Sequence, residues 1–310
     1  MHSEDFLTAA PRPGRRRVLG LAGLAAGAAL AGPARAAHAS PRAADGAAAA
    51  LRRLEREHGA RVGAYARNLT TGRTVAHRAG ELFPLLSTFK ALAAAAVLRD
   101  LDRDGETLER RIHYTEADLI DGSDVTRAHL ATGMTVSELC DAAVCDSDNA
   151  AGNLLLRELG GPSAVTRFCR SLGDPVTRLD RWEPELNSAE PWQRRDTTTP
   201  YALAHDLARL VVGNALEPRD RARLTHWMLN CRTSGTRFRT GLPADWTIAD
   251  KTGSGFAYGA CHDAGIAWTP AGDPVALAVL TVKPDAGAEG DHPLIAKTAA
   301  VLAQAVGGGR

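Results

Sequence analysis

The spacing of hydrophobic and polar residues changes twice along the chain. Residues 47–58 have helical spacing, and two strand-like runs follow at 61–69 and 74–77, joined by a turn sequence typical of a hairpin. Helical spacing then dominates between residues 87 and 230. It predicts helices over 88–101, 136–143, 150–158, 163–172, 199–213 and 218–230. Strand patterns return at 247–251, 262–268 and 275–282, and a last helix is predicted over 293–306.

The order of these elements predicts an α+β fold. Because strands come from both ends of the chain with a helical block between them, we expect a sheet domain of residues 40–82 and 230–310. Residues 83–229 are expected to form an inserted all-helical domain, with a cleft where the two domains meet. Residues 174–198 lack periodicity and are rich in Pro, Trp and charge, so they predict a long ordered loop, which usually has a function.

Composition favours a small molecule as the functional partner. The chain has 310 residues, of which 45% are hydrophobic and 24% charged, enough to bury a full core. The formal net charge is +1 and both signs are spread along the sequence. We therefore expect no nucleic acid and no anionic membrane as partner, and we expect a monomer.

The N-terminus predicts an export signal over residues 1–36. Three arginines at 15–17 precede an apolar stretch at 19–31 that is shorter than the roughly 18 residues of a membrane span. Small residues follow, which predicts cleavage near Ala36 or Ala39. The paired arginines and mildly apolar core resemble a twin-arginine signal, so we expect a secreted or periplasmic protein. No cysteine lies near the cleavage sites, so no stable membrane anchor is expected.

The cysteines and histidines do not indicate a metal site. Five cysteines are an odd number for an exported protein, and buried free thiols are the preferred interpretation. The sequence has no Cys-x-x-Cys and no His-Glu-x-x-His spacing, which argues against a zinc hydrolase. We expect no metal and no cofactor.

Lysine is rare in this chain and is concentrated where chemistry is expected. The sequence has 37 Lys+Arg, but its lysines are Lys90, Lys251, Lys283 and Lys297 alone. A lysine can lose its proton when it is buried, whereas an arginine cannot. Lys90 lies three residues after Ser87, so both side chains would project from one helix face, and hydroxyl and amine could share a proton. This predicts a serine hydrolase with a lysine base.

Four segments in order carry a resemblance to a known family: Ser87-Thr88-Phe89-Lys90, Ser147-Asp148-Asn149, Glu183-Pro184-Glu185-Leu186-Asn187 and Lys251-Thr252-Gly253. The ordered set resembles the class A serine β-lactamases over about residues 47–306. The resemblance implies an antiparallel sheet flanked by N- and C-terminal helices, with an Ω-shaped loop at 180–197 in the helical domain. It also implies hydrolysis of the β-lactam amide of penicillins and cephalosporins, and hence antibiotic resistance.

The same resemblance implies a role for each matching residue. Ser87 would be the nucleophile, Lys90 its base, and Ser147 the proton relay to the leaving nitrogen. Glu183, rather than Glu185, would aim the water that releases the acyl group. Substrate binding is implied for a further set: Asn149, Asn187, Lys251, Thr252, Gly253, Ser254 and Arg237. Arg181 and Asp196 match an ion pair that closes the loop, and Arg239 fits a structural role.

The sequence departs from the family pattern at the cleft entrance. Gly122 stands where the family usually has an aromatic residue, and Leu86 and Gly255 replace the cysteines of the carbapenemase disulfide. Two alternative functions stay open. A penicillin-binding D,D-peptidase would use the same serine and lysine but would not need Glu183. A non-catalytic β-lactam-binding module would not acylate Ser87 at all. The sequence does not indicate which β-lactam subclass is preferred.

Overall fold

The structure is a computed structural model, and it describes residues 41–307. The predicted export signal and both of its cleavage sites lie outside the described residues. Within this range a five-stranded sheet has the strand order β2-β1-β9-β8-β7, and every neighbouring pair is antiparallel. Its strands are β1 (Arg61–Asn68), β2 (Thr74–His77), β7 (Thr247–Ser254), β8 (Cys261–Trp268) and β9 (Pro274–Val282). The strand and hairpin predictions are confirmed.

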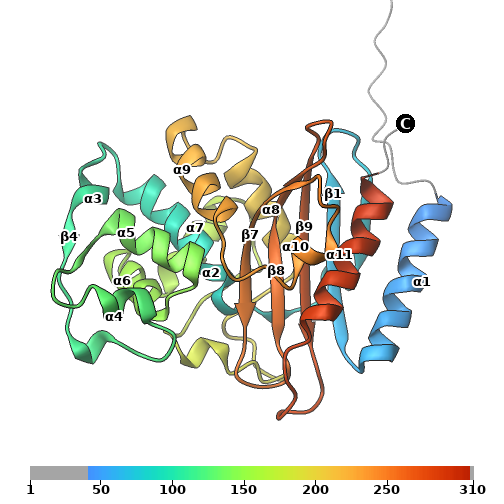
Figure 1. Ribbon diagram of the computed structural model, residues 1–310, viewed down its shortest axis with the longest axis horizontal. Coiled ribbons are helices and arrows are strands. Elements are labelled where there is room, and N and C mark those ends of the chain that lie inside the picture. Colours follow the sequence, from blue (N-terminus) through green and yellow to red (C-terminus); the bar gives the residue numbers. More distant parts are fainter. Residues whose placement is uncertain (1–40, 308–310) are drawn as a thin grey trace, which may run out of the picture. The chain divides into compact units, whose positions relative to one another are not determined.

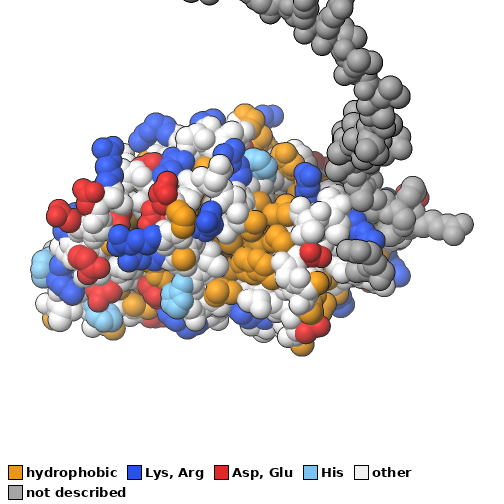
Figure 2. Space-filling view, turned by 90° about the horizontal axis from the view of Figure 1, so that it is seen from above, with side chains coloured by type: hydrophobic (Ala, Val, Ile, Leu, Met, Phe, Trp, Pro, Cys, Tyr) orange, Lys and Arg blue, Asp and Glu red, His pale blue; other side chains and the backbone are white. Residues whose placement is uncertain are grey.

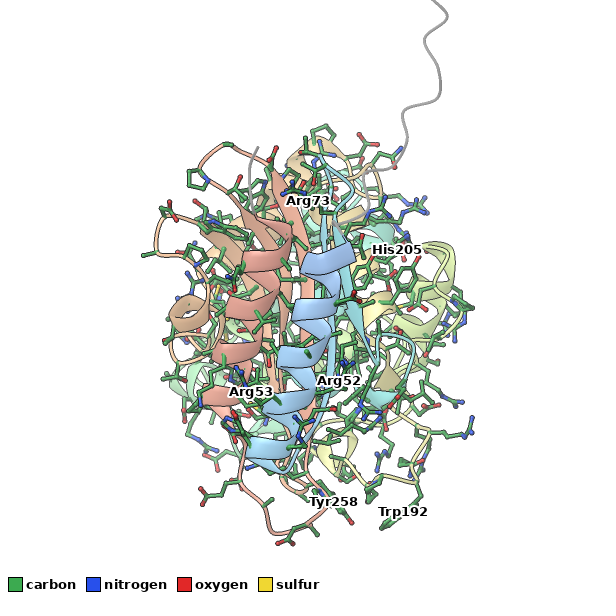
Figure 3. All side chains as sticks on the ribbon, turned by 90° about the vertical axis from the view of Figure 1, so that its right-hand side faces the viewer. Arg52, Arg53, Arg73, Trp192, His205 and Tyr258 are labelled. Carbon is green, nitrogen blue, oxygen red and sulfur yellow. The ribbon has the colours of Figure 1, made fainter. Side chains whose placement is uncertain are left out.

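Helices from both ends of the described chain cover one face of the sheet. Helices α1 (Pro41–His58) and α11 (His292–Val306) lie side by side on this face (Figures 1 and 3). Helix α8 (Pro200–Val211) packs on the opposite face against β9, β8 and β1 (Figure 1). The arrangement confirms the α+β prediction and the expected sheet flanked by N- and C-terminal helices.

Strand β9 explains why its sequence is an almost unbroken apolar run. Successive side chains of a strand point to opposite faces. Leu277 and Val279 therefore join the core under α1 and α11, whereas Ala278 and Leu280 join the core on the side of α8. Both faces are buried, so neither needs polar residues. The same alternation along β8 places His262 and Asp263 in buried positions near the cleft.

The helical segments follow the predicted positions within a few residues. They are α2 (Phe89–Ala96), α5 (Val136–Asp141), α6 (Asn149–Glu158), α7 (Ser163–Ser171) and α9 (Pro218–Leu229). A π-helical turn extends α2 over Val97–Leu101 and another extends α5 over Ala142–Asp146. The pattern did not predict the shortest elements: α3 (Glu106–Glu109), α4 (Asp124–Ala128), α10 (Phe238–Gly241), β4 (Arg111–Ile112) paired with β5 (Met134–Thr135), and β3 (Phe83–Pro84) paired with β6 (Thr197–Thr198). The boundaries of the sheet domain and of the inserted helical domain stay a prediction.

Two boundaries differ from the prediction where they matter for the cleft. Strand β7 does not end at Lys251 but continues to Ser254, so the Lys-Thr-Gly segment lies within the sheet. Ser87 lies in a short 3-10 turn, Leu86–Thr88, that precedes α2. The extended strand β7 contacts the turn that carries Ser87.

Charged side chains of both signs lie on the surface of the described residues. Figure 2 shows Lys and Arg interspersed with Asp and Glu over one part of the face it presents, beside a patch of hydrophobic side chains. Among residues 41–307, no helix is both long and apolar enough to cross a bilayer. The five cysteines are all free and buried in the described residues, as expected.

Asp148 connects two helices beneath the cleft. Its carboxylate caps α6 by accepting a hydrogen bond from Ala151 N at 2.9 Å. It also accepts bonds from the backbone N of Thr126 at 2.9 Å and from its hydroxyl at 3.0 Å, in α4. The side chain is 2% exposed. Ser147 and Asn149 on either side of Asp148 are thereby placed by a structural residue.

Replacing Asp148 with Ala should lower the free energy of unfolding by about 3 kcal/mol, because one helix cap and the bonds of a buried carboxylate are lost together. Urea denaturation followed by circular dichroism measures the change. Asp124→Ala is the matched control, since Asp124 is exposed in the first turn of α4 and should change stability by no more than about 0.5 kcal/mol. Equal effects of the two substitutions would contradict the role of Asp148.

Candidate active site

Ser87 and Lys90 meet as the sequence predicts. The ammonium of Lys90 donates to Ser87 Oγ at 3.0 Å, and Ser87 Oγ donates to Glu183 Oε1 at 3.1 Å. Leu86, just before the nucleophile, has a φ of 52°, a left-handed conformation that costs a non-glycine residue free energy. Packing maintains this conformation, because Leu86 is fully buried. Ser87 itself is 6% exposed and lies at the start of the turn that leads into α2.

Lys90 is surrounded by oxygen atoms from two other segments, the Ser-Asp-Asn segment and the loop that carries Glu183. Its Nζ lies 2.7 Å from Ser147 O, 2.6 Å from Asn149 Oδ1 and 3.0 Å from Glu183 Oε1. The side chain has no exposed surface. Burial lowers the pKa of Lys90, while the charge and hydrogen bond of Glu183 act in the opposite direction. The lysine therefore sits where it can carry a proton or exchange one with its neighbours.

Ser147 connects the two buried lysines. Its backbone carbonyl accepts from Lys90, and its hydroxyl accepts from Lys251 Nζ at 2.9 Å. Ser147 has a φ of 64°, in the left-handed region of backbone conformation. In this conformation its carbonyl contacts Lys90 while its hydroxyl contacts Lys251. Burial, together with the charges of Lys90 and Arg237, lowers the pKa of Lys251 to about 8. Lys251 can therefore donate a proton near neutral pH.

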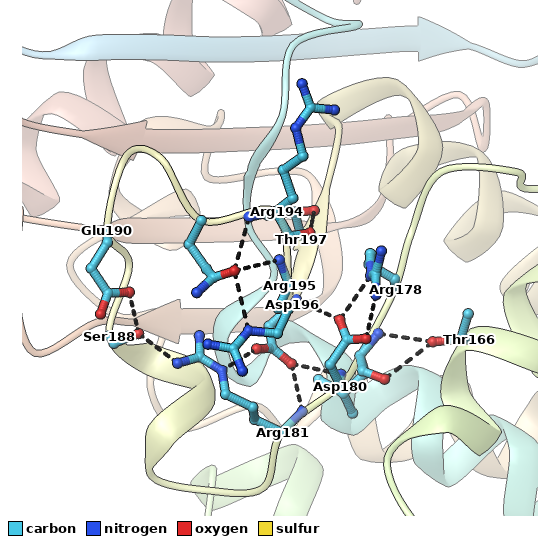
Figure 4. A network of polar contacts seen from close by, with 12 residues as sticks. Thr166, Arg178, Asp180, Arg181, Ser188, Glu190, Arg194, Arg195, Asp196 and Thr197 are labelled. Carbon is cyan, nitrogen blue, oxygen red and sulfur yellow. Dashed lines mark hydrogen bonds and ion pairs between the residues drawn. The ribbon is translucent and has the colours of Figure 1, made fainter.

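The loop that carries Glu183 is closed by an ion pair. Arg181 Nε donates to Asp196 Oδ2 at 2.6 Å, and the other oxygen of Asp196 accepts from the backbone N of Asp180 and of Arg181 (Figure 4). Asp196 is 1% exposed, so this pair is shielded from water. Further along, Trp192 packs edge to face on Tyr258 with ring centroids 6.3 Å apart, at one end of the molecule (Figure 3). The loop is thus ordered at its base and its outer edge.

Glu183 is placed by its backbone as well as by its carboxylate. Its N–H donates to Asn153 Oδ1 at 2.9 Å and its carbonyl accepts from Asn153 Nδ2 at 2.9 Å, a reciprocal pair across α6. Asn187 Nδ2 donates to Glu183 Oε2. Glu183 is 3% exposed, whereas Glu185 points into solvent. Of the two acids in this segment, Glu183 is the one that contacts Ser87.

Gly253 allows strand β7 to approach the nucleophile. A Cβ atom at this position would lie 2.8 Å from Leu86 Cβ and 3.4 Å from Ser87 N, so a larger residue would displace the strand. Thr252 shares a 2.5 Å hydrogen bond with Thr233, and Ser254 is exposed at the end of the strand. The end of β7 therefore presents hydroxyl and backbone groups beside Ser87.

Arg237 lies behind β7 rather than in open solvent. It is 3% exposed, and its Nη1 donates to the carbonyls of Gly253 and His262 at 2.9 and 2.6 Å. Its Nη2 donates to Ser254 Oγ at 2.7 Å, which brings the positive charge to the edge of the cleft. Arg239 instead pairs with Asp250 and donates to Leu229 O, as expected for a structural residue.

Gly122 contacts the amide of Asn149. It has a φ of +73°, and a Cβ here would lie 2.9 Å from Asn149 Nδ2. Asn149 Nδ2 donates to the neighbouring carbonyl of Asp121 at 2.8 Å, while its Oδ1 accepts from Lys90. In this backbone, a side chain at position 122 would press on the amide that helps to hold Lys90.

The structure brings together every residue that the sequence named for the site: Ser87, Lys90, Ser147, Asn149, Glu183, Asn187, Arg237, Lys251, Thr252, Gly253 and Ser254. Sequence reasoning missed Thr233, which bonds Thr252, and His292, whose Nε2 accepts from Arg237 at 3.1 Å. Neither belongs to a motif or a periodic pattern, because each acts through a partner that is distant in the chain.

Comparison with known proteins gives one consistent family. A family model described as "Beta-lactamase enzyme family" matches residues 46–306. A beta-lactamase of Streptomyces cellulosae is 60% identical over 300 residues, which cover 94% of this chain and 96% of that protein. A beta-lactamase of Streptomyces lavendulae is 59% identical, over 97% of this chain and 99% of that one.

Solved structures agree with the sequence comparison. The beta-lactamase from Streptomyces albus G superposes with a TM-score of 0.83 at 57% identity, covering 84% of this chain and 99% of that chain. A variant of the last common ancestor of Gram-negative bacteria beta-lactamase class A superposes with a TM-score of 0.80 at 46% identity, covering 84% and 98%. With its serine, lysine and glutamate in contact, the chain belongs to the beta-lactamase enzyme family, as a class A serine β-lactamase.

Proposed function

We propose that this protein hydrolyses the β-lactam amide of penicillins and cephalosporins through an acyl-Ser87 intermediate. The observation that carries the proposal is the contact of Ser87 Oγ with both Lys90 Nζ, at 3.0 Å, and Glu183 Oε1, at 3.1 Å. A serine hydroxyl becomes a useful nucleophile when an adjacent base accepts its proton. Two candidate bases therefore contact the same oxygen.

Acylation begins with the loss of the Ser87 proton. In this geometry the hydroxyl donates to Glu183 Oε1, while Lys90 donates to the hydroxyl oxygen and would stabilise the negative charge that develops there. Ser87 Oγ attacks the lactam carbonyl carbon, and the backbone N–H groups of Ser87 and Ser254 would bind the oxyanion. The close approach at Gly253 supports this pair of donors, since it brings the end of β7 to Ser87 N.

Opening of the ring requires a proton for the leaving nitrogen. Ser147 Oγ, which accepts from Lys251 Nζ at 2.9 Å, would donate its proton as the carbon–nitrogen bond breaks, and Lys251 would then supply a proton to Ser147. The pKa of Lys251, about 8 through burial, suits such a donor near neutral pH. Asn149 would bind the side-chain amide of the substrate, and its contact with Lys90 keeps it in place.

The substrate carboxylate would be recognised at the end of β7. Lys251, Thr252 and Ser254 offer an ammonium and two hydroxyls on the side of the cleft that faces Ser87. Arg237 adds a guanidinium whose Nη2 contacts Ser254 Oγ. Charge-assisted hydrogen bonds of this kind are stronger than neutral ones, and they give orientation as well as affinity.

Release of the acyl group distinguishes a β-lactamase from a D,D-peptidase. Glu183 would activate a water molecule toward the ester carbonyl, with Asn187 holding the carboxylate through its donated hydrogen bond. The burial of Glu183 against Ser87 favours hydrolysis over the peptidase alternative, because a peptidase has no need of a carboxylate at this position. The product is the ring-opened acid, and Ser87 regains its proton.

We also propose that the protein acts outside the cytoplasm, as a monomer, after export by a twin-arginine signal at residues 1–36. The sequence of that segment supports this localisation, with arginines at 15–17 ahead of a short apolar stretch.

Glu183→Ala should still be acylated by benzylpenicillin, because Lys90 also contacts Ser87 Oγ and can accept its proton, but it should fail to release the acyl group. The covalent adduct on Ser87 should appear in the protein mass spectrum, and steady-state turnover should fall by at least about 10³, in line with loss of a general base. Glu185→Ala is the matched control, since Glu185 is exposed in the same segment, and it should retain turnover without an adduct. Turnover of Glu183→Ala near the unsubstituted rate, or trapping in the control instead, would refute this role of Glu183.

Arg237→Ala should lower kcat/KM for benzylpenicillin by one to two powers of ten, or about 1.4 to 2.7 kcal/mol, because a cation beside the substrate carboxylate is removed. The loss should shrink for analogues that lack the carboxylate. The unfolding temperature, measured in parallel, shows how much stability is lost with the bonds to Gly253 O and His262 O that the substitution also removes. An equal loss for both kinds of substrate would mean that Arg237 acts through the structure alone.

Replacing Arg15, Arg16 and Arg17 with Lys should block export while activity in the cytoplasmic fraction persists, because a twin-arginine signal is read by its arginines. Fractionation followed by a β-lactam hydrolysis assay measures both quantities. Unimpaired export of the substituted protein would rule out the twin-arginine assignment.

A further inference from the structure

A second cluster of ionisable side chains lies away from the proposed catalytic residues. It consists of Cys169 on α7, Asp174 shortly after the end of α7, and Asp206 on α8. One potential ligand atom from each residue, a sulfur and two carboxylate oxygens, lies within 4.8 Å of the others. All three residues are buried, and it is the one such group of potential metal ligands that the described residues form.

Asp206 is the member that lacks partners. It has no exposed surface, and neither of its carboxylate oxygens has a hydrogen-bond partner among residues 41–307. The nearest basic side chain is His205, whose Nδ1 lies 3.6 Å from Asp206 Oδ1, beyond hydrogen-bond distance, and burial lowers the pKa of this histidine. An unpaired carboxylate in such surroundings is strongly destabilising. The cluster therefore requires either protons or a cation.

Asp174 and Cys169 surround Asp206 with further acidic groups. The carboxylate of Asp174 accepts from the backbone N of Val176 at 2.7 Å and of Thr177 at 3.1 Å, which fixes its orientation. Burial, followed by the charge of Asp174, raises the pKa of Asp206 to about 9. Burial also raises the pKa of the Cys169 thiol. Without a metal, Asp206 and Cys169 therefore keep their protons.

We propose that Cys169, Asp174 and Asp206 form a binding site for a divalent metal ion of the zinc type. A thiolate combined with two carboxylates suits Zn²⁺ or Cd²⁺ better than the oxygen-binding ions Ca²⁺ and Mg²⁺. Around a tetrahedral Zn²⁺ these ligand atoms would be roughly 3.4 to 3.6 Å apart, so only a small closure of the cluster is needed. The Cys169 and Asp206 protons would pass to solvent, and a water molecule would complete the coordination.

The site would add a common centre to three segments that packing and hydrogen bonds already join, among them the bonds from Arg209 Nη1 to Leu172 O at 3.0 Å and from Arg170 Nη1 to Asp174 O at 2.7 Å. Cys169 lies in the last turn of α7, Asp174 begins the irregular segment that leads to Glu183, and Asp206 lies in the middle of α8. A bound metal would thus stabilise the base of this segment without touching Ser87. This proposal does not depend on the proposed hydrolysis. Observed metal binding would overturn the expectation, drawn from the sequence, that the protein holds no metal.

Cd²⁺ is the probe, because its bond to a thiolate gives an ultraviolet charge-transfer band that surface histidines and carboxylates cannot produce. The full protein, freed of metals by chelation, is unfolded in urea and refolded with increasing Cd²⁺, since the buried cluster is accessible during folding. We expect the band to saturate at about one Cd²⁺ per chain and the unfolding temperature to rise, as for any ligand that binds only the native state. Zn²⁺ should abolish the band by competition.

Three variants identify the ligands. Cys169→Ala should lose the band, whereas Cys140→Ala, which removes another buried thiol outside the cluster, should keep it. Asp206→Asn, which preserves the shape of the side chain, should weaken Cd²⁺ binding at least tenfold and should remove the metal-dependent rise in unfolding temperature. No band in the unsubstituted protein, or a band of unchanged size in Cys169→Ala or unchanged affinity in Asp206→Asn, would overturn the proposal and leave a cluster held by protons alone.

Discussion

The buried ammonium of Lys90 is the constraint on which the rest of the site depends. A charged group without exposed surface costs several kcal/mol unless hydrogen bonds replace its water, so the fold must bring oxygen atoms to it. They come from Ser87 in the same helical segment, from Ser147 and Asn149 before and at the start of α6, and from Glu183 in the long loop. Helix α2 can bury Lys90 only when these segments are in place. The burial of Lys90 therefore requires the same contacts that form the site.

Two further buried cations make the site positive before any substrate binds. Lys251 shares Ser147 with Lys90, and the mutual repulsion, added to burial, lowers the pKa of Lys251. Arg237 contributes to the same repulsion from behind β7. Glu183 is the carboxylate in direct contact with Lys90, and it balances one of the charges. An anionic substrate would balance another, so the charges of the site favour a ligand with a carboxylate at the end of β7.

The sequence predicted the long elements and the motif residues, and it failed where contacts alone decide the structure. Apolar spacing located α6 and β9 because each buries whole faces, and the Ser-Asp-Asn segment was found through the family resemblance. The sequence predicted an end of strand β7 at Lys251, which is too early. Thr252, Gly253 and Ser254 have no strand pattern and are ordered by pairing with β8. His292 and Thr233 could not be found in this way, because their partners are remote in sequence and carry no periodic signal.

The two halves of the proposed reaction rest on different kinds of structure. Ser87 and Lys90 belong to a buried turn and helix whose geometry follows from the core, so acylation needs little beyond the fold. Glu183 stands on a loop with little regular structure, and local bonds place it: the reciprocal pair with Asn153 and the ion pair of Arg181 with Asp196. Loosening either contact would move the carboxylate away from Ser87 while leaving the nucleophile intact. The difference between an enzyme that is only acylated and one that turns over therefore lies in how firmly this loop is held.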